Sequence, residues 1–284
     1  MSANVAEAIA ALVGRPVART RSLGGALHEV ELADGTRLIA KRTKLPGATA
    51  AEAAGLTWLA EPGAVPVPTV HGHDDEWLVL DLVAGGRPSA ASAAEFGQRL
   101  AVLHAAGAPA FGAPPPGGPV DAWLGLAPMR NATGAHWPTW FAEHRIEPYL
   151  RTAVDDGALD TDERRLIETV CARVDELAGP AEPPARIHGD LWSGNVLWAP
   201  DGAWLIDPAA HGGHRETDLA TLAVFGCPRL DRILAAYDEA APLADGWRAR
   251  VPLHQLFILT MHVARFGRGY AGATVAAARA ALCG

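Results

Sequence analysis

Two short polar segments, joined by a pair of apolar runs, constrain this chain most strongly. They are Ile187-His188-Gly189-Asp190-Leu191-Trp192-Ser193-Gly194-Asn195 and Leu205-Ile206-Asp207-Pro208. The apolar runs between them flank the turn sequence Pro200-Asp201-Gly202, so we predict a β-hairpin. If this hairpin is centred near Asp201, Leu197 faces Leu205 and Asn195 faces Asp207. A register slip of one residue would break that pairing.

Asp190, Asn195 and Asp207 are the candidate chemical groups of this hairpin. Magnesium prefers a few hard oxygen ligands, which suits Asn195 and Asp207. Asp190 is then free to meet an acceptor hydroxyl, as phosphoryl transfer requires. The structural alternative is a loop built on Asx turns. The second aspartate across the predicted hairpin favours the functional interpretation.

Composition limits the classes of protein that this chain can represent. Its 284 residues suffice for one two-lobed domain or two small ones, and 49% of them are hydrophobic. The net charge of −8 argues against a nucleic-acid partner. No apolar run is long enough to span a membrane, and Glu7 interrupts the N-terminal apolar stretch, so we expect neither a membrane anchor nor a signal peptide. Cys171, Cys227 and Cys283 form no metal motif and indicate a reducing, cytoplasmic compartment.

The N-terminal region predicts a short helix followed by a hairpin. Apolar residues on one face favour a helix over residues 3–13. The hairpin arms are residues 27–32 and 37–41, joined across Asp34-Gly35. Gly24 and Gly25 lead into the first arm. Such a pair can bring backbone N–H groups close to phosphates, although a plain turn has the same sequence.

Lys41 ends the second arm of that hairpin. A lone lysine at a strand end is usually a solvated edge charge. Glu52 in the next helix offers it a partner for an ion pair, which is the interpretation we favour. The competing interpretation is that Thr49 and Glu52 form a capping box that only fixes the helix start.

The remaining elements follow from periodicity, proline and glycine. Residues 65–70 are predicted to be extended and residues 77–80 to form a buried strand. Further helices are expected after Ser89, over 161–177 and within 253–282, whereas residues 107–119 form a loop by composition.

The polar motifs resemble one family closely. His188-Gly189-Asp190-Leu191-Trp192-Ser193-Gly194-Asn195, then Ile206-Asp207-Pro208, then His214-Arg215-Glu216-Thr217-Asp218-Leu219-Ala220, are similar to those of the fructosamine kinase family of the protein-kinase-like superfamily. Weaker similarities at Glu52–Leu56, 137–146 and 265–267 extend the resemblance over nearly the whole chain.

The resemblance implies an α+β, protein-kinase-like, two-lobed fold. Residues 1–83 would form a small N-terminal nucleotide-binding lobe with an antiparallel sheet and one main helix. Residues 84–284 would form a larger, mostly helical catalytic lobe, with a hinge at 81–86. In such folds His188 is scaffolding. We interpret Asp218 as a buried carboxylate that holds the catalytic loop by hydrogen bonds.

The resemblance also implies ATP- and Mg²⁺-dependent phosphorylation of a sugar hydroxyl on a ketosamine, the adduct of a sugar with an amine. Asp190 would orient the acceptor hydroxyl, and Asn195 and Asp207 would hold the metal. The residues assigned to the nucleotide are Gly24, Gly25, Lys41, Glu52, Asp81, Leu82 and Val83. The partner would be a small ketosamine or glycated amine, and the protein a monomer or weak dimer.

Other interpretations remain open at this point. Kinases of aminoglycosides, choline or homoserine share His-Gly-Asp, although residues 191–193 and 214–216 favour the ketosamine branch. A non-catalytic nucleotide-binding protein would not need Lys41 together with all three polar groups of the hairpin. A zinc site within 211–220 fits no zinc spacing. The chain departs from the family after Phe111-Gly112, where a Pro-Gly run stands, so acceptor specificity does not follow from the motifs.

Overall fold

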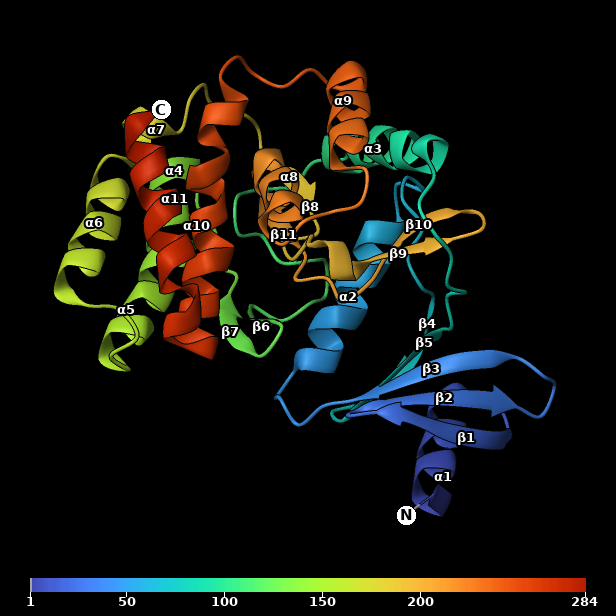
Figure 1. Ribbon diagram of the computed structural model, residues 1–284. Helices are drawn as coiled ribbons and strands as arrows, with labels where there is room; N and C mark the ends of the chain where they lie inside the picture. The colour runs from blue at the N-terminus through green and yellow to red at the C-terminus, as the bar shows by residue number, and fades with distance from the viewer. Residues whose placement is uncertain (1) are drawn as a thin grey trace.

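A five-stranded antiparallel sheet organises the N-terminal part of the computed structural model, which describes residues 2–284. Its spatial order is β1-β2-β3-β5-β4. The strands are β1 (Val17–Gly24), β2 (Leu27–Leu32), β3 (Arg37–Arg42), β4 (Val70–His73) and β5 (Trp77–Asp81). Helix α1 (Ser2–Val13) packs on the sheet, and α2 (Ala48–Ala60) runs from the sheet toward the helical body (Figure 1).

The predicted hairpin of this sheet is confirmed. Leu27 pairs with Lys41 across β2 and β3, and the chain turns at Asp34-Gly35. Strand β1 was not anticipated, and it changes the setting of the glycine pair. Gly24 closes β1 with φ 105° and pairs with Leu27, and Gly25, with φ 55°, forms the β1–β2 turn together with Ala26. Both angles lie in the region of positive φ that favours glycine.

The rest of the chain is mostly helical (Figure 1). The long helices are α3 (Ala90–Ala105), α5 (Glu147–Asp155), α6 (Thr161–Ala172), α8 (Arg215–Val224), α9 (Leu230–Ala240), α10 (Trp247–Phe266) and α11 (Ala271–Cys283). Short helical segments are α4 (Trp137–Phe141), a π-helical turn (Ala142–Ile146) and α7 (Val174–Leu177). The predicted helix over 161–177 is therefore broken, at Arg173.

Three two-stranded ribbons complete the architecture. They pair β6 (Asp121–Leu124) with β7 (Ala127–Arg130), β8 (Ala185–Ile187) with β11 (His211–Gly213), and β9 (Val196–Ala199) with β10 (Gly202–Leu205). The β6–β7 hairpin lies beside α2, whereas β9 and β10 lie on the other side of α2, below α3 (Figure 1).

The predicted register of the β9–β10 hairpin is wrong by one residue. Leu205 pairs with Val196 and Leu197 pairs with Trp204, so Asn195 lies opposite Ile206 and not Asp207. The reason is the loop length. Gly202 adopts φ 130° and joins the strand, which leaves a two-residue loop where the prediction assumed three.

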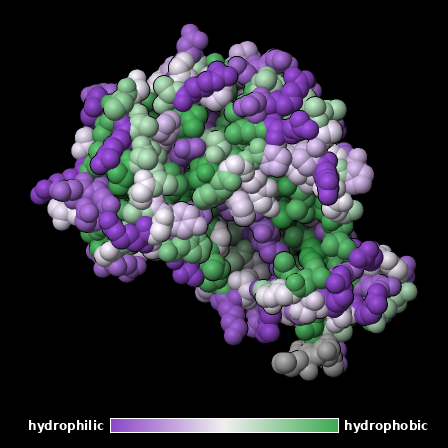
Figure 2. Space-filling view, in the orientation of Figure 1, coloured by the Kyte–Doolittle hydropathy of each residue, from purple (hydrophilic) through white to green (hydrophobic). Residues whose placement is uncertain are grey.

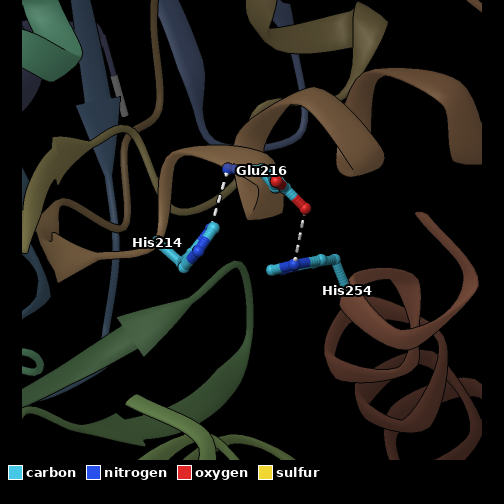
Figure 3. Close-up of side chains that lie close together, drawn as sticks. All are labelled: His214, Glu216 and His254. Atoms are coloured by element: carbon cyan, nitrogen blue, oxygen red, sulfur yellow. Dashed lines mark hydrogen bonds and ion pairs between the residues drawn. The ribbon is translucent and has the colours of Figure 1, made fainter. Parts of the chain in front are cut away.

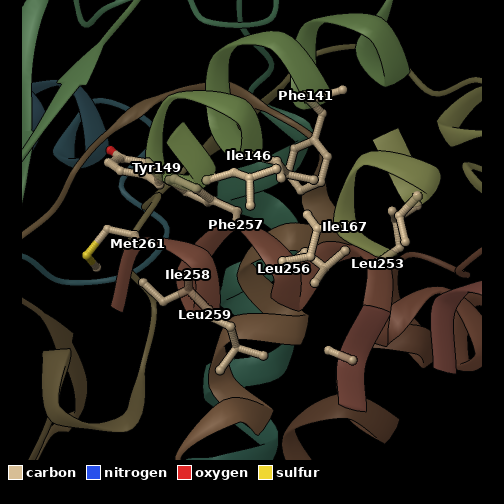
Figure 4. Close-up of a cluster of buried hydrophobic side chains, with 14 of the residues drawn as sticks. Phe141, Ile146, Tyr149, Ile167, Leu253, Leu256, Phe257, Ile258, Leu259 and Met261 are labelled. Carbon is tan, nitrogen blue, oxygen red and sulfur yellow. The ribbon is translucent and has the colours of Figure 1, made fainter. Parts of the chain in front are cut away.

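Separate apolar clusters stabilise the two ends of the molecule. In the sheet region, Ile9 of α1 packs with Val30, Leu38 and Val79. The largest cluster lies between α4–α6, α10 and α11, and Figure 4 shows part of it, with Phe141 among the side chains of these helices. The aromatic residues of 137–146 are buried in this cluster. A hollow separates the sheet from the helical body, and apolar side chains gather beside it near β4, β5 and β9–β10 (Figure 2). Within residues 2–284, no helix combines the length and apolarity needed to cross a bilayer.

Candidate active site

The predicted chemical groups meet in one cavity of about 460 Å³ between α2, the β3 end, the β6–β7 hairpin and the loops around β9–β10. Lys41, Glu52, Asp190, Asn195 and Asp207 all line it. These residues come from segments up to 166 positions apart in sequence. The cavity therefore unites the lysine of the sheet with the polar residues of the hairpin.

Lys41 and Glu52 form the expected ion pair. The Lys41 Nζ donates to both Glu52 carboxylate oxygens at 2.7 and 2.8 Å. The capping-box alternative is wrong, because α2 begins after Gly47 without a side-chain cap, and the Thr49 hydroxyl instead donates to the Asp74 carbonyl. Glu52 thus lies in the second turn of α2, where its side chain reaches β3.

A third group joins this pair, which sequence reasoning did not anticipate. Lys41 Nζ also donates to Asp207 Oδ1 at 2.6 Å. Asp207 has a left-handed backbone with φ 53°, uncommon for a residue other than glycine. This backbone conformation, and not the alternation of side chains along the hairpin strand, sets the direction of the Asp207 carboxylate. It brings Asp207 into the cavity despite the shifted hairpin register.

Asp190 and Asn195 are oriented toward each other. Asn195 Nδ2 donates to the Asp190 carbonyl at 2.8 Å and to Asp190 Oδ2 at 3.1 Å. Both bonds use the amide nitrogen, so the amide oxygen of Asn195 stays available as a ligand. Burial, reinforced by the charges of Asp207 and Asp218 and opposed by the Asn195 hydrogen bond, raises the pKa of Asp190 to about 7.

Buried side chains fix the loop that carries Asp190 by hydrogen bonds. Asp218 is fully buried and accepts from the backbone N–H groups of His188 and Gly189 at 2.7 and 2.9 Å. His104 Nε2 lies 3.2 Å from the same carboxylate. Burial alone would raise the pKa of Asp218, but the interactions with His104 and His188 outweigh it and lower the pKa. Asp218 therefore has the loop-holding position that the sequence predicted.

His188 is part of the scaffold. Its Nδ1 accepts from the Asp190 N–H at 3.2 Å, and its Nε2 lies 2.9 Å from the Ile206 carbonyl. Because Nδ1 accepts, Nε2 carries the proton and donates. Burial lowers the pKa of His188, consistent with a neutral ring. One imidazole thus ties the Asp190 loop to the residue before Asp207.

Comparison with known proteins decides the family. Residues 34–282 match the sequence model of the fructosamine kinase family. The chain belongs to the fructosamine kinase family. It is accordingly an ATP-dependent kinase with an alcohol group as acceptor.

Individual relatives agree with this assignment. A probable ketoamine kinase of Thermus thermophilus is 35% identical over 232 residues, which cover 80% of each chain. A crystal structure from Thermobifida fusca, assigned provisionally as fructosamine-3-kinase, superposes with a TM-score of 0.93 at 51% identity over 99% of both chains. A macrolide 2′-phosphotransferase of Brachybacterium faecium (TM-score 0.63, 18% identity, 96% and 97% coverage) shares the kinase-like fold.

The charge balance of this kinase's cavity fits a divalent cation. When ionised, Glu52, Asp190 and Asp207 supply three negative charges against the positive charge of Lys41, while Arg42, the other cation of the lining, is paired with Glu76. Burial and the charge of Asp207 raise the pKa of Glu52 against the opposing effect of Lys41, as expected where carboxylates outnumber cations. Carboxylate and amide oxygens are the donors that Mg²⁺ prefers. The residues present therefore suit this metal.

Other predicted nucleotide residues lie outside the cavity lining. Gly24, Gly25, Asp81, Leu82 and Val83 do not line it. The Asp81 carboxylate is occupied by the Thr69 N–H at 2.9 Å and by His71 at 2.7 Å. The roles of these five residues stay predictions.

The β6–β7 hairpin contributes cavity residues that sequence reasoning missed. Trp123, Leu126 and Asn131 line the cavity, together with Pro115 and Pro119 of the Pro-Gly loop. The alternating apolar run around Gly125 is the signal that could have predicted this hairpin. The loop that departs from the family pattern thus lies against the site.

The histidine-rich segment contributes to a buried polar cluster. His214, Glu216 and His254 lie close together, all buried (Figure 3). Arg250 Nη2 and Nε donate to the two Glu216 carboxylate oxygens at 2.6 and 3.0 Å, so the negative charge is already compensated. Burial lowers the pKa of both histidines. The fixed guanidinium of Arg250 would repel a cation at this cluster, and the absence of zinc stays a prediction.

Proposed function

We propose that this kinase transfers the γ-phosphoryl group of ATP to a sugar hydroxyl, the 3-hydroxyl, of a small ketosamine. The observation that carries the proposal is the convergence of Lys41, Asp190, Asn195 and Asp207 on one cavity. Family membership supplies the reaction class. The catalytic contribution is mainly positioning and charge neutralisation, as in other phosphoryl transfers.

In this proposal Asp190 accepts the proton of the acceptor hydroxyl as the hydroxyl oxygen attacks the γ-phosphorus and ADP leaves. A pKa near neutrality suits a general base at physiological pH. Lys41, fixed by Glu52, contacts the phosphates. Asn195 Oδ1 and the Asp207 carboxylate would hold Mg²⁺, which when bound would neutralise phosphate charge.

We also propose that residues 81–86 form the hinge between lobes 1–83 and 84–284, and that the adenine binds there. Leu82 and Val83 follow the last residue of β5, and their backbone groups make no hydrogen bond with the described residues. Backbone N–H and C=O groups that are not used within the protein can pair with the polar edge of an adenine. The β1–β2 turn at Gly24-Gly25 would cover the phosphates, in a cytoplasmic enzyme.

The test is an ADP-release assay on fructosyl- and ribulosyl-lysine beside kanamycin, with phosphorus NMR to locate the phosphate. We expect kcat/KM to be higher for at least one ketosamine, with the phosphate on the 3-hydroxyl. Faster turnover of kanamycin than of every ketosamine would contradict the proposal and favour an antibiotic kinase.

A further inference from the structure

Asn131 is a buried asparagine that lines the cavity. It directly follows the last residue of β7, is 2% exposed, and belongs to the same lining as Asp190. Its backbone N–H donates to the carbonyl of Val120, the residue before β6, at 2.7 Å. The base of the β6–β7 hairpin therefore fixes the backbone position of Asn131.

The orientation of the Asn131 amide follows from its contact with Arg145. Arg145 Nη2 donates to Asn131 Oδ1 at 3.0 Å. A guanidinium has N–H donors and no acceptor, so only the oxygen of the amide can face it. Nδ2 is thereby directed away from Arg145, and it is buried without a hydrogen-bond partner among residues 2–284. Buried donors are nearly always paired, so this N–H group has an unused binding capacity.

Neutral groups hold the Arg145 guanidinium in place. Its Nη1 donates to the carbonyls of Arg130 and His144 at 2.9 and 3.1 Å, and its Nε donates to His211 Nε2 at 3.4 Å. The Trp140 ring centre lies 4.5 Å from the guanidinium carbon. Burial lowers the pKa of Arg145 only to about 10, so the side chain stays cationic at neutral pH. No charge among these partners neutralises it.

The buried cation strengthens the free donor of Asn131. A charged donor at Oδ1 draws electron density from the amide nitrogen, which makes the remaining N–H groups better donors. In the low dielectric of a buried site, water does not screen this effect. The Nδ2 group is therefore suited to a hydroxyl, carbonyl or ring oxygen of a ligand in the cavity.

A series of contacts connects Asn131 with the loop that carries Asp190. The Gly189 backbone lies against the His211 ring, since a Cβ built on Gly189 would lie 3.0 Å from His211 Cε1. His211 in turn accepts from Arg145, which holds the Asn131 amide. Asp190 follows Gly189 directly. Asn131 and Asp190 therefore belong to one packed unit and line one cavity.

We infer that Asn131 binds the acceptor, with its Nδ2–H group donating to a sugar oxygen other than the hydroxyl that receives the phosphate. The inference deepens the proposed function and rests on it, because there Asp190 meets the reacting hydroxyl. The buried, unpaired Nδ2 of a residue that lines the cavity carries it. Arg145 fixes the amide from outside the cavity lining.

The experiment compares Asn131→Asp with the wild type on fructosyl- and ribulosyl-lysine. The carboxylate keeps an oxygen for Arg145 and replaces the free donor by an acceptor. We expect kcat/KM for the ketosamine to fall about 5- to 100-fold through a higher KM. The kcat should change less than about threefold, because ground state and transition state lose the same contact. ATP affinity in calorimetry should stay within about twofold of the wild type.

Two further variants separate binding from folding. Gln255→Glu is the matched control, because the Gln255 amide donates to the Ala220 carbonyl at 3.2 Å and lies outside the cavity lining. This control should lower the urea midpoint and leave the ketosamine KM unchanged. Asn131→Asp should instead keep or raise the urea midpoint, because a carboxylate pairs more strongly with a guanidinium than an amide does. Asn131→Ala removes the amide without adding charge, and it should lower the midpoint and raise the ketosamine KM.

The outcomes separate this inference from the proposed function. A wild type that phosphorylates no ketosamine would refute both. With an active wild type, an unchanged ketosamine KM in Asn131→Asp would show that the amide serves only Arg145, and it would overturn the inference alone. A loss of ATP affinity, or a fall in kcat at unchanged KM, would assign the amide to the nucleotide or to the support of Asp190 and would also overturn it. Asn131→Ala gives the same test of KM if Asn131→Asp does not fold.

Discussion

Replacing Asp218 by asparagine should weaken both the fold and the catalysis, although this residue does not line the cavity. Its Oδ2 accepts from His188 N–H and faces His104, and its Oδ1 accepts from Gly189 N–H. Asparagine keeps the size but turns one oxygen into a donor. The least costly orientation places that donor against Gly189, whose buried N–H then loses its partner.

The size of the effect follows from these contacts. A buried donor left without a partner costs about 1–3 kcal/mol, and the two remaining hydrogen bonds each lose about 1 kcal/mol of charge assistance. We therefore expect the free energy of unfolding to fall by about 3–5 kcal/mol. Gly189 cannot shift freely, because it has φ 81° and even a Cβ there would lie 2.2 Å from the Ala209 carbonyl oxygen. Asp190 follows directly, so kcat should fall about 10- to 100-fold.

Urea unfolding at constant m-value measures the loss of stability. Steady-state kinetics on the folded variant measure the loss of kcat. Asp156→Asn serves as the control, because Asp156 is exposed at the end of α5 and should change stability by less than about 0.5 kcal/mol. An Asp218→Asn protein that unfolds at the wild-type urea concentration with the wild-type kcat would refute the loop-holding argument.

Three further predictions concern the cavity itself. Asp190→Asn should lower kcat about 10²- to 10⁴-fold with ATP affinity nearly unchanged in calorimetry. The wild-type kcat/KM should rise with pH through about 7 and level off above it, because Asp190 must lose its proton to accept one; a flat pH profile would contradict this. Lys41→Ala and Glu52→Ala should each reduce kcat/KM, with the double variant little worse than either, whereas additive losses would show that the ion pair is not shared in function. Asp207→Ala should remove most Mg²⁺-dependent turnover while urea unfolding shows a folded protein, and near-normal kcat at saturating Mg²⁺ would exclude Asp207 as a ligand.

The local features of this protein could be predicted from the sequence, because they depend on residues that are close together in the chain. Turn residues placed the β2–β3 and β9–β10 hairpins, and helical spacing placed α1 and α10. The family motifs predicted the kinase-like fold, since the residues of a motif occur together with the fold that positions them. The Lys41–Glu52 pair could also be predicted, because both residues belong to consecutive elements whose pairing is common in kinases.

Tertiary structure alone decided the arrangements that join distant segments. The contact of Lys41 with Asp207 spans 166 positions and depends on a left-handed backbone at an aspartate, which no local propensity predicts. The hairpin register depended on one glycine joining a strand. The β6–β7 hairpin lines the cavity because it packs on the segment before α2, a contact between residues 77 positions apart in the sequence. The sequence pattern specifies which residues have side chains suited to binding and catalysis. Tertiary packing specifies which of these side chains come into contact.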